Sequence, residues 1–473
     1  MTSPSAHDST TFWRLDHPQA SPALIDAASG HATSYGELRT LADASADDLA
    51  ATPPRALGFV LATNDTPTVA RYLAALRRGH VVALLDARLA PALLARLLDA
   101  YRPDWVSGPT GGAPPSGYSP TASSAGDDLF VRSEPTGGAL HPDLALLLST
   151  SGTTGSPKMV RLASTAVAAN AASIARYLDL TDLERPITTL PLHYSYGLSV
   201  LNSHLAAGAC VVLTGESVAR RELWAAVDRH GVTSISGVPY TYQMLARLRF
   251  DAMALPSLRT LTQAGGRLDP ALVRQFGESA AARGRRFFVM YGQTEAVARM
   301  SYVPPEALLD HVGSVGIAIP GGALDIDEAT SELSYRGPNV MLGYGESLAD
   351  LAAGDELAGV LRTGDLARRD ADGFVWLSGR TKRFVKLFGL RVSLDEVEQL
   401  AQEVSPSPVA CVGEDDALVV AVEDPGHEAA IVESIATTFG IHRSALRAAA
   451  IGPLDRLTTG KLDYGRIRER VGL

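Results

Sequence analysis

Residues 146–160 read LLLSTSGTTGSPKMV. The leucines at 146–148 predict a buried strand, which stops at a loop of small hydroxyl residues and glycines that ends at Lys158. Glycine lets the backbone approach an anion closely, threonine hydroxyls donate hydrogen bonds, and lysine supplies a point charge. The loop therefore has the composition of a phosphate-binding loop, although a plain surface turn of serine, threonine and glycine has the same composition.

The spacing within this loop excludes one nucleotide-binding motif. The pattern GxxxxGK[ST] cannot be laid over SGTTGSPK, residues 151–158, in any register. The loop instead resembles the phosphate-binding motif of the adenylate-forming enzymes, the superfamily of acyl-CoA ligases, adenylation domains and luciferases. Met159 is a departure from that pattern, because many members have glycine after the lysine.

Six further segments resemble motifs of the same superfamily and follow one another in its order. They are LPLHYSYGLS at 190–199, QAGGRL at 263–268, YGQTEA at 291–296, LRTGDL at 361–366, GRTKRFVKLFGLRVSLDEVE at 379–398 and TTGKLDYGRI at 458–467. Each alone is a weak signal, but the ordered set extends over nearly the whole chain. The resemblance implies an enzyme that uses ATP to convert a carboxylic acid to an acyl-adenylate, releases pyrophosphate and then transfers the acyl group to a thiol.

Composition limits the remaining classes of function. The chain has 473 residues, of which 46% are hydrophobic and 20% charged, values typical of a globular protein with about three packed units. Its formal net charge of −10 argues against a surface for nucleic acid or an anionic membrane. Cys210 and Cys411 lie in apolar runs, which predicts buried side chains and neither a disulfide nor a metal site.

The N-terminal sequence has no basic segment followed by an apolar core, so it does not predict a secretory signal. The longest apolar stretches, such as 80–98, are interrupted by charges and are too short to span a membrane. We therefore expect a cytoplasmic protein that binds neither membrane nor nucleic acid; the sequence leaves its oligomeric state open.

The order of periodic segments predicts an α/β fold. Residues 56–107 alternate apolar runs with helical periods, which indicates a βαβαβ unit and a parallel sheet. Residues 108–128 are rich in glycine, proline and serine and predict a flexible surface connection. A second αβ unit is expected from a helix near 164–178 and strands near 210–214, 233–236, 259–263 and 286–290, and short strands after about 311 suggest a small β-barrel region.

We predict two domains from this pattern and the resemblance. A large N-terminal AMP-binding domain, residues 1–381, contains two αβ subdomains and the small β-barrel region. A small mobile α+β domain, residues 382–473, follows it and contains the catalytic lysine.

The resemblance assigns residues to the nucleotide site. Glu295 matches the family position that binds Mg²⁺, a cation that prefers carboxylate oxygen; its alternative role is an acid that favours the start of a helix. Tyr291 would stack on adenine, although core packing is an ordinary role for such a tyrosine. Asp365 has two acceptor oxygens for the ribose hydroxyls, although aspartate is also common in turns. The remaining predicted nucleotide-binding residues are Thr150, Ser151, Gly152, Thr153, Thr154, Gly155, Lys158, Gly265, Gly266, Arg267, Gly292, Gln293, Thr294 and Arg380.

Lys461 is the residue that the resemblance makes most important for catalysis, since its counterpart bridges the substrate carboxylate and the α-phosphate. Taken alone it could equally be a solvated lysine in a turn. Thr294, Glu295 and His193 are the other predicted catalytic residues, with Thr294 at the α-phosphate. A histidine in such a place is often simply packed, and His193 could gate the acyl site without transferring protons.

The acyl pocket is predicted from the same motifs. Two tyrosines, an imidazole and small residues favour an acid of modest size, aromatic acids included, over a long fatty chain. The predicted pocket residues are His193, Tyr194, Tyr196, Gly197, Gly237, Val238, Tyr242, Gln263 and Val297.

The segment KLFGLRV, 386–392, is predicted to serve the second half-reaction. Lys382 matches the hinge about which the small domain of the family rotates, and Gly389 would let a pantetheine arm pass close to backbone. Lys386 and Arg391 belong to the same predicted hinge and thiol tunnel. CoA is the expected acceptor. A carrier-protein phosphopantetheine and an amine or other small nucleophile are the alternatives, since the C-terminal domain is short for binding the nucleotide part of CoA.

Overall fold

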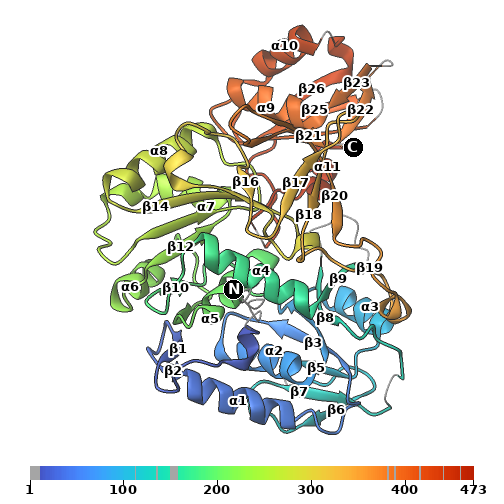
Figure 1. Cartoon of the computed structure of the whole chain (residues 1–473). Helices are drawn as coiled ribbons and strands as arrows, with labels where there is room; N and C mark the ends of the chain where they lie inside the picture. Colours follow the sequence, from blue (N-terminus) through green and yellow to red (C-terminus); the bar gives the residue numbers. More distant parts are fainter. Residues whose placement is uncertain are drawn as a thin grey trace, which may run out of the picture. The chain divides into compact units, whose positions relative to one another are not determined.

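The predicted βαβαβ unit is present in the computed structural model of the chain (Figure 1). The structure describes residues 11–473 except 112, 135–136, 150–157, 381–382, 388–389, 415–416, 440 and 459. The unit consists of β3 (Leu57–Ala62), α2 (Thr66–Arg78), β4 (Val81–Asp86), α3 (Pro91–Tyr101) and β5 (Trp105–Ser107). Its three strands are parallel, as expected for strands joined by helices.

Local sequence signals explain the bounds of α2. The Asp65 side chain accepts a hydrogen bond from the backbone N–H of Thr68, and Pro67 stands in the first turn, where its missing N–H is tolerated. Gly79 ends the helix with a φ of 72°. Every residue from 68 to 76 is buried, so α2 is an internal helix.

These strands belong to an eight-stranded sheet. Its order is β19-β9-β8-β4-β3-β5-β7-β6, and the strands not yet introduced are β6 (Tyr118–Thr121), β7 (Leu129–Arg132), β8 (Leu144–Ser149), β9 (Met159–Ala163) and β19 (Gly343–Gly345). Strand β8 is the buried strand predicted before the glycine-rich loop, and it lies parallel to β4.

The stretch 108–128 is not wholly the irregular connection that the sequence predicts. It contains β6, which pairs antiparallel with β7 at the edge of the sheet. Tyr118 is buried, and its hydroxyl donates a hydrogen bond of 2.6 Å to the carbonyl oxygen of Pro103. One buried aromatic residue fixes this strand among glycine, proline and serine, so composition gave too weak a signal.

A nine-stranded sheet forms the second αβ subdomain. Its order is β16-β15-β14-β13-β12-β10-β11-β1-β2, with β1 (Pro22–Asp26), β2 (Ala32–Ser34), β10 (Pro186–Ile187), β11 (Val211–Leu213), β12 (Ser234–Gly237), β13 (Thr260–Gln263), β14 (Arg286–Tyr291), β15 (Ser301–Val303) and β16 (Ile317–Ala318). Strands β12, β13 and β14 are parallel and end at one edge. The helices of this region and of the N-terminus are α1 (Tyr35–Asp47), α4 (Ser164–Tyr177), α5 (Ser195–Ala206), α6 (Arg221–Arg229), α7 (Pro239–Arg247) and α8 (Pro270–Ala282).

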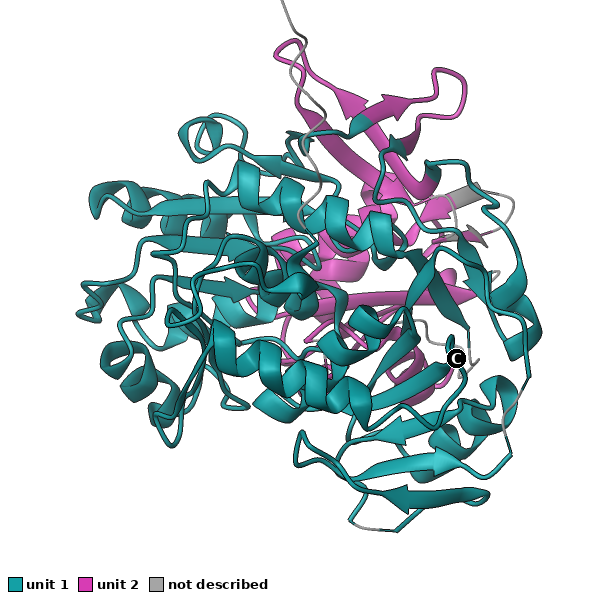
Figure 2. Cartoon of the chain, turned by 60° about the horizontal axis from the view of Figure 1, so that its bottom comes forward, with its two compact units in different colours: residues 1–150, 155–323, 335–361 teal, residues 151–154, 324–334, 362–473 magenta. Residues whose placement is uncertain are grey.

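The described residues fall into two compact units (Figure 2). The first contains both large sheets and the second contains residues 324–334 and those after 361. The expected β-rich region is largely in the second unit, as a four-stranded sheet of order β17-β18-β20-β21. Its strands are β17 (Ala323–Ile326), β18 (Glu332–Arg336), β20 (Val360–Arg369) and β21 (Val375–Arg380). The compact unit thus begins before residue 382, and a domain boundary at 382 stays a prediction.

The C-terminal part of the second unit is α+β. A three-stranded sheet of β24 (Val409–Glu414), β25 (Ala417–Val422) and β26 (Leu446–Ala450) has one apolar cluster on each face. Helices α9 (Leu394–Val404) and α10 (Glu428–Phe439) contribute to one cluster, and α11 (Tyr464–Val471) to the other. A hairpin of β22 (Phe384–Leu387) and β23 (Leu390–Ser393) precedes them.

Arg71 on α2 forms a buried ion pair with two aspartates of the first unit. Its guanidinium is fully buried and contacts Asp48 at 3.2 Å and Asp127 at 3.0 Å. Asp127 precedes β7, so the pair ties the segment after β6 to α2.

We expect Asp127→Ala to lower the free energy of unfolding by about 3 kcal/mol, because it leaves a buried guanidinium incompletely compensated. Urea denaturation followed by tryptophan fluorescence measures the loss. Asp43→Ala is the matched control, since Asp43 pairs with Arg77 and its side chain is 53% exposed; its loss should stay below about 1 kcal/mol. Equal losses in the two variants would show that the buried ion pair contributes no more to the free energy of unfolding than the exposed one.

Candidate active site

A tight chain reversal lies at the carboxyl end of β14. The backbone N–H of Met300 donates a hydrogen bond of 2.9 Å to the carbonyl oxygen of Tyr291, which closes the loop between β14 and β15. A Cβ atom on Gly292 would lie 1.9 Å from the carbonyl oxygen of Ala298. Only glycine fits at this position, because the two sides of the loop are in contact.

The same loop contains two consecutive non-glycine residues with positive φ. Val297 has a φ of 53° and Ala298 a φ of 93°, backbone conformations that cost energy for residues with a Cβ. The reversal holds Thr294 and Glu295 in a short 3₁₀ helix, Thr294–Ala296, at the edge of the sheet. Strain retained in this loop is typical of a functional site.

Tyr344 on β19 joins two of the predicted nucleotide-binding residues. Its hydroxyl donates a hydrogen bond of 2.8 Å to Oε1 of Glu295, and Nζ of Lys158 lies 3.7 Å from the centre of its ring. Burial, together with the neighbouring Glu295 carboxylate, raises the pKa of Tyr344, so the phenol stays protonated. The Glu295 carboxylate and the Lys158 ammonium group therefore both contact the side chain of Tyr344.

The beginning of α5 contacts the same loop. The hydroxyls of Ser195 and Thr294 lie 3.2 Å apart. Farther along the motif, Tyr196 donates a hydrogen bond of 3.0 Å to the carbonyl oxygen of Thr262 on β13. Tyr242 on α7 donates to the same oxygen at 2.9 Å. Two of the three predicted pocket tyrosines thus contact the same carbonyl oxygen of β13.

His193 lies just before α5 and is buried. Its Nε2 is 3.7 Å from Oδ2 of Asp86, which is too long for a hydrogen bond, and neither ring nitrogen has a hydrogen-bond partner among the described residues. Burial lowers the pKa of His193, while Asp86 opposes that shift. The imidazole is therefore neutral near pH 7, which fits a wall of a pocket better than a charged group.

The other predicted pocket and adenine-site residues of the first unit lie at the ends of β12, β13 and β14. Gly237 and Gln263 are the last residues of β12 and β13, and Val238 caps α7. The Gln263 amide donates a hydrogen bond of 2.9 Å to the carbonyl oxygen of Gly266. At the same edge the chain continues with Gly265, Arg267, Tyr291, Gln293 and Val297, and Tyr194 and Gly197 lie at the start of α5.

The second unit contains the predicted ribose and catalytic residues. Nε of Arg380 donates a hydrogen bond of 2.7 Å to the buried carboxylate of Asp365, its partner across β20 and β21. Lys461 lies in a turn, where the N–H of Leu457 donates to its carbonyl oxygen at 2.8 Å. Gly460 has a φ of 80°, which permits that turn.

Arg383 attaches the chain after the predicted hinge to the C-terminal helices. It pairs with Asp395 and with Glu398 on α9, and its guanidinium lies 4.2 Å from the ring centre of Tyr464. Predicted site residues 150–155, together with Lys382 and Gly389, lie outside the described residues, and only the backbone of Lys386 and Arg391 is described.

Sequence reasoning missed Tyr344, Asp86 and Arg299. Tyr344 lies in GYG at 343–345, outside every segment that resembled a motif, and Asp86 ends an apolar strand. Arg299 follows YGQTEA by three residues and is buried at 2% exposure. A charged residue in an apolar context was the only signal that the sequence offered for the last two.

Within the described residues there is no group of His, Cys, Asp and Glu side chains arranged to hold a metal by themselves. Cys210 and Cys411 are buried, as predicted, and both are free cysteines. Nor does any helix in the described ranges have the length and apolar character needed to cross a membrane.

Comparison with known proteins identifies relatives of this chain. A family model described as AMP-binding enzyme matches residues 12–345. An indoleacetate–CoA ligase of Aromatoleum aromaticum is 32% identical over 387 residues, 76% of this chain and 73% of that protein. A sulfoacetate–CoA ligase of Cupriavidus necator is 28% identical over 479 residues, 93% of this chain and 90% of the relative.

Solved structures support the fold. An amide bond synthetase of Marinactinospora thermotolerans superposes with a TM-score of 0.78 and covers 98% of this chain and 99% of its own. Its sequence identity to this chain is 23%. The likeness shows the fold, including a large first and a smaller second part.

We expect Tyr344→Phe to raise the Mg²⁺ concentration needed for half-maximal ATP-dependent activity about tenfold. The phenylalanine ring still contacts Lys158, but Glu295 loses a hydrogen bond to its charged carboxylate, an interaction worth about 1.5 kcal/mol. Magnesium titration at fixed ATP measures the effect. Tyr302→Phe is the matched control, because Tyr302 stacks on Tyr177 away from this cluster. An unchanged magnesium dependence in Tyr344→Phe would exclude this role.

Proposed function

The chain belongs to the AMP-binding enzyme family, and from this membership we propose that it is an AMP-forming acid–thiol ligase. It activates a small to medium carboxylic acid with ATP, releases pyrophosphate and transfers the acyl group to a thiol. CoA is the proposed acceptor, because the two sequence relatives described above are CoA ligases.

The observation that supports this function best is that Lys158 and Glu295 both contact Tyr344. ATP with Mg²⁺ brings anionic phosphates and a hard cation to one place, and these groups need an ammonium and a carboxylate respectively. The donor set fits: Glu295 supplies carboxylate oxygen for Mg²⁺, and Lys158 a charge for the phosphates. When bound, Mg²⁺ supplies charge neutralisation on the phosphates.

Adenylation then requires little proton transfer. A carboxylate oxygen forms a bond to the α-phosphorus while the bond from that phosphorus to the pyrophosphate oxygen breaks. The acid is already ionised near pH 7, so no general base is needed. Thr294 donates its hydroxyl toward the α-phosphate, Lys461 offsets the anionic charge of the transition state, and Asp365 holds the ribose hydroxyls.

The use of lysine in this chain agrees with the assignment. The sequence contains only four lysines, Lys158, Lys382, Lys386 and Lys461, against a total of 42 lysines and arginines. All four lie in segments that resemble family motifs. Where a cation is needed elsewhere the chain uses arginine, so the lysine side chain is retained where a compact charge is required.

The decisive experiment is a pyrophosphate-release screen over a panel of carboxylic acids, with AMP and ADP separated by chromatography. We expect acid-dependent formation of AMP and pyrophosphate. Product analysis with CoA, with a phosphopantetheinylated carrier protein and with an amine then assigns the acceptor. Formation of ADP, or no acid-dependent pyrophosphate with any acid of the panel, would refute the proposal.

We expect Lys461→Ala to reduce acid-dependent pyrophosphate release at least 100-fold, because it removes a charge from the transition state. Thioester formation from a supplied acyl-adenylate should persist, since that half-reaction does not use this charge. The melting temperature checks that the fold is intact. Lys386→Ala serves as a control for removing a lysine of the second unit, and adenylation should tolerate it. Full adenylation activity of Lys461→Ala would contradict the assignment.

A further inference from the structure

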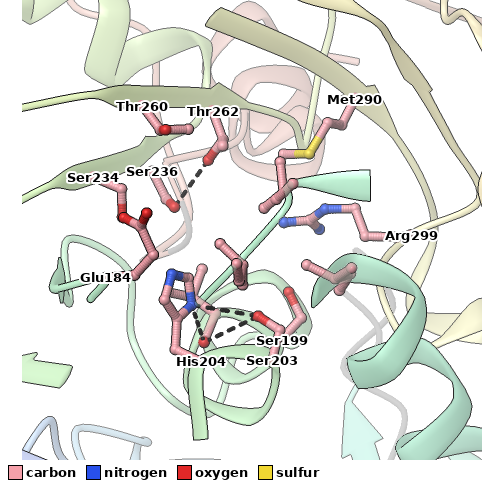
Figure 3. Close-up of a pocket in the computed structure, with 14 residues that line it drawn as sticks. Glu184, Ser199, Ser203, His204, Ser234, Ser236, Thr260, Thr262, Met290 and Arg299 are labelled. Carbon is pink, nitrogen blue, oxygen red and sulfur yellow. Dashed lines mark hydrogen bonds between the residues drawn. The ribbon is translucent and has the colours of Figure 1, made fainter. Parts of the chain in front are cut away.

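A small pocket lies between the nine-stranded sheet and helices α4 and α5 of the first unit (Figure 3). Ser234 and Ser236 on β12, with Thr260 and Thr262 on β13, line one side, since alternate strand residues face the same way. The free space at its centre is about that of a water molecule. Met290 on β14 also lines it, and this flexible side chain can yield to a small end group but not to a long chain.

Arg299 points into this pocket (Figure 3). Its side chain is 2% exposed, and its guanidinium lies 3.8 Å from the ring centre of Tyr196. One amino group donates to the adjacent carbonyl oxygen of Ala298 at 3.2 Å, and the Tyr177 hydroxyl is a further side-chain partner of the guanidinium, whereas Nε is buried with no hydrogen-bond partner among the described residues. No carboxylate pairs with Arg299 in the part of the chain that the structure describes.

Arg71 and Arg161 are also fully buried, and both are compensated. Arg71 contacts two aspartates, and Arg161 forms an ion pair of 2.6 Å with Glu356. An uncompensated buried charge costs several kcal/mol, and contact with one aromatic ring returns only about 2 kcal/mol. Arg299 can therefore still bind an anion, whereas Arg71 and Arg161 are already paired with carboxylates.

The remaining ionisable groups of the pocket do not serve Arg299. Glu184 pairs with Arg259 at 3.2 Å and accepts a hydrogen bond of 2.6 Å from Thr233. Nδ1 of His204 contacts the carbonyl oxygen of Val200 at 2.8 Å, and burial lowers the pKa of His204 to about 4. Because His204 is neutral at pH 7, the positive charge in the pocket is that of Arg299.

Helix α5 contributes residues both to this pocket and to the predicted reacting centre. Tyr196, which lies under the Arg299 guanidinium, follows Ser195, whose hydroxyl meets Thr294 at 3.2 Å. Arg299 itself is four residues beyond Glu295 on the same strained loop. Arg299 and Thr294 therefore lie on the same loop, and both contact the first turn of α5.

We propose that Arg299 binds a second anionic group of the acid, a carboxylate or sulfonate at the end opposite the reacting carboxylate. This inference rests on the proposed function and specifies its substrate class as short acids with two anionic ends. Sulfoacetate, the acid named for one relative, has a sulfonate in that position. Arg299 is accordingly a specificity-determining residue.

The test compares Arg299→Met with the wild type on matched acids: succinate with butyrate, and sulfoacetate with propionate. For the wild type, kcat/KM for pyrophosphate release should favour the acid with two anionic groups. In Arg299→Met the ratio within each pair should fall at least 100-fold, and Arg299→Lys should recover part of it. An unchanged ratio would overturn the proposal, and so would an equal preference of the wild type for succinamate, in which a neutral amide replaces the second carboxylate.

A stability measurement separates this role from a structural one. Arg299→Met should leave the melting temperature of the ligand-free protein unchanged or raise it, because it removes an uncompensated buried charge. Arg161→Met, which removes a paired arginine, should lower it. A large loss of stability in Arg299→Met would show that Arg299 is structural and overturn the proposal.

Thermal shift decides the case in which no acid gives pyrophosphate. That result would refute the proposed ligase activity. The anion site would then still be supported if succinate, and not butyrate, raised the melting temperature of the wild type and failed to do so for Arg299→Met. Absence of that difference would refute the anion site as well.

Discussion

The close approach of Gly292 to the carbonyl of Ala298 is the constraint on which the candidate site depends. Glycine at position 292 permits the chain to reverse within the few residues between β14 and β15, and two non-glycine residues take positive φ values in the same loop. The outer side of the loop holds Glu295 beside Tyr344, and its return holds Arg299 over Tyr196. One strained loop thus positions a group proposed for the nucleotide and a group proposed for the acid.

The cations of the first unit have two kinds of partner, carboxylates and aromatic rings. The guanidinium groups of Arg71 and Arg161 are neutralised by carboxylates and hold segments of the first unit together. Lys158 and Arg299 instead contact aromatic rings. A ring stabilises a cation without neutralising it, so both groups keep the ability to bind an anion. In a chain with a net charge of −10, such local cations are what an anionic substrate requires.

Sequence reasoning was strong where a periodic pattern was long and weak where one side chain decided the structure. The alternation over 56–107 correctly predicted the βαβαβ unit, which extends from β3 at residue 57 to β5 at residue 107. Strand β6 was missed, because it depends on the burial of Tyr118 within a stretch of turn-forming residues. Tyr344 was missed for a related reason: its role comes from contact with Lys158 and Glu295, which are 186 and 49 positions away in the chain.

The sequence by itself determined the class of fold, the family and the residue types available for chemistry, because strand and helix periods and ordered motifs are local properties of the chain. Tertiary structure alone decided which of those residues meet and in what state. Burial makes His193 neutral, Tyr344 joins Lys158 to Glu295, and the absence of a described carboxylate beside Arg299 leaves a buried charge uncompensated. These properties depend on desolvation and on distances between remote segments, which no local pattern records.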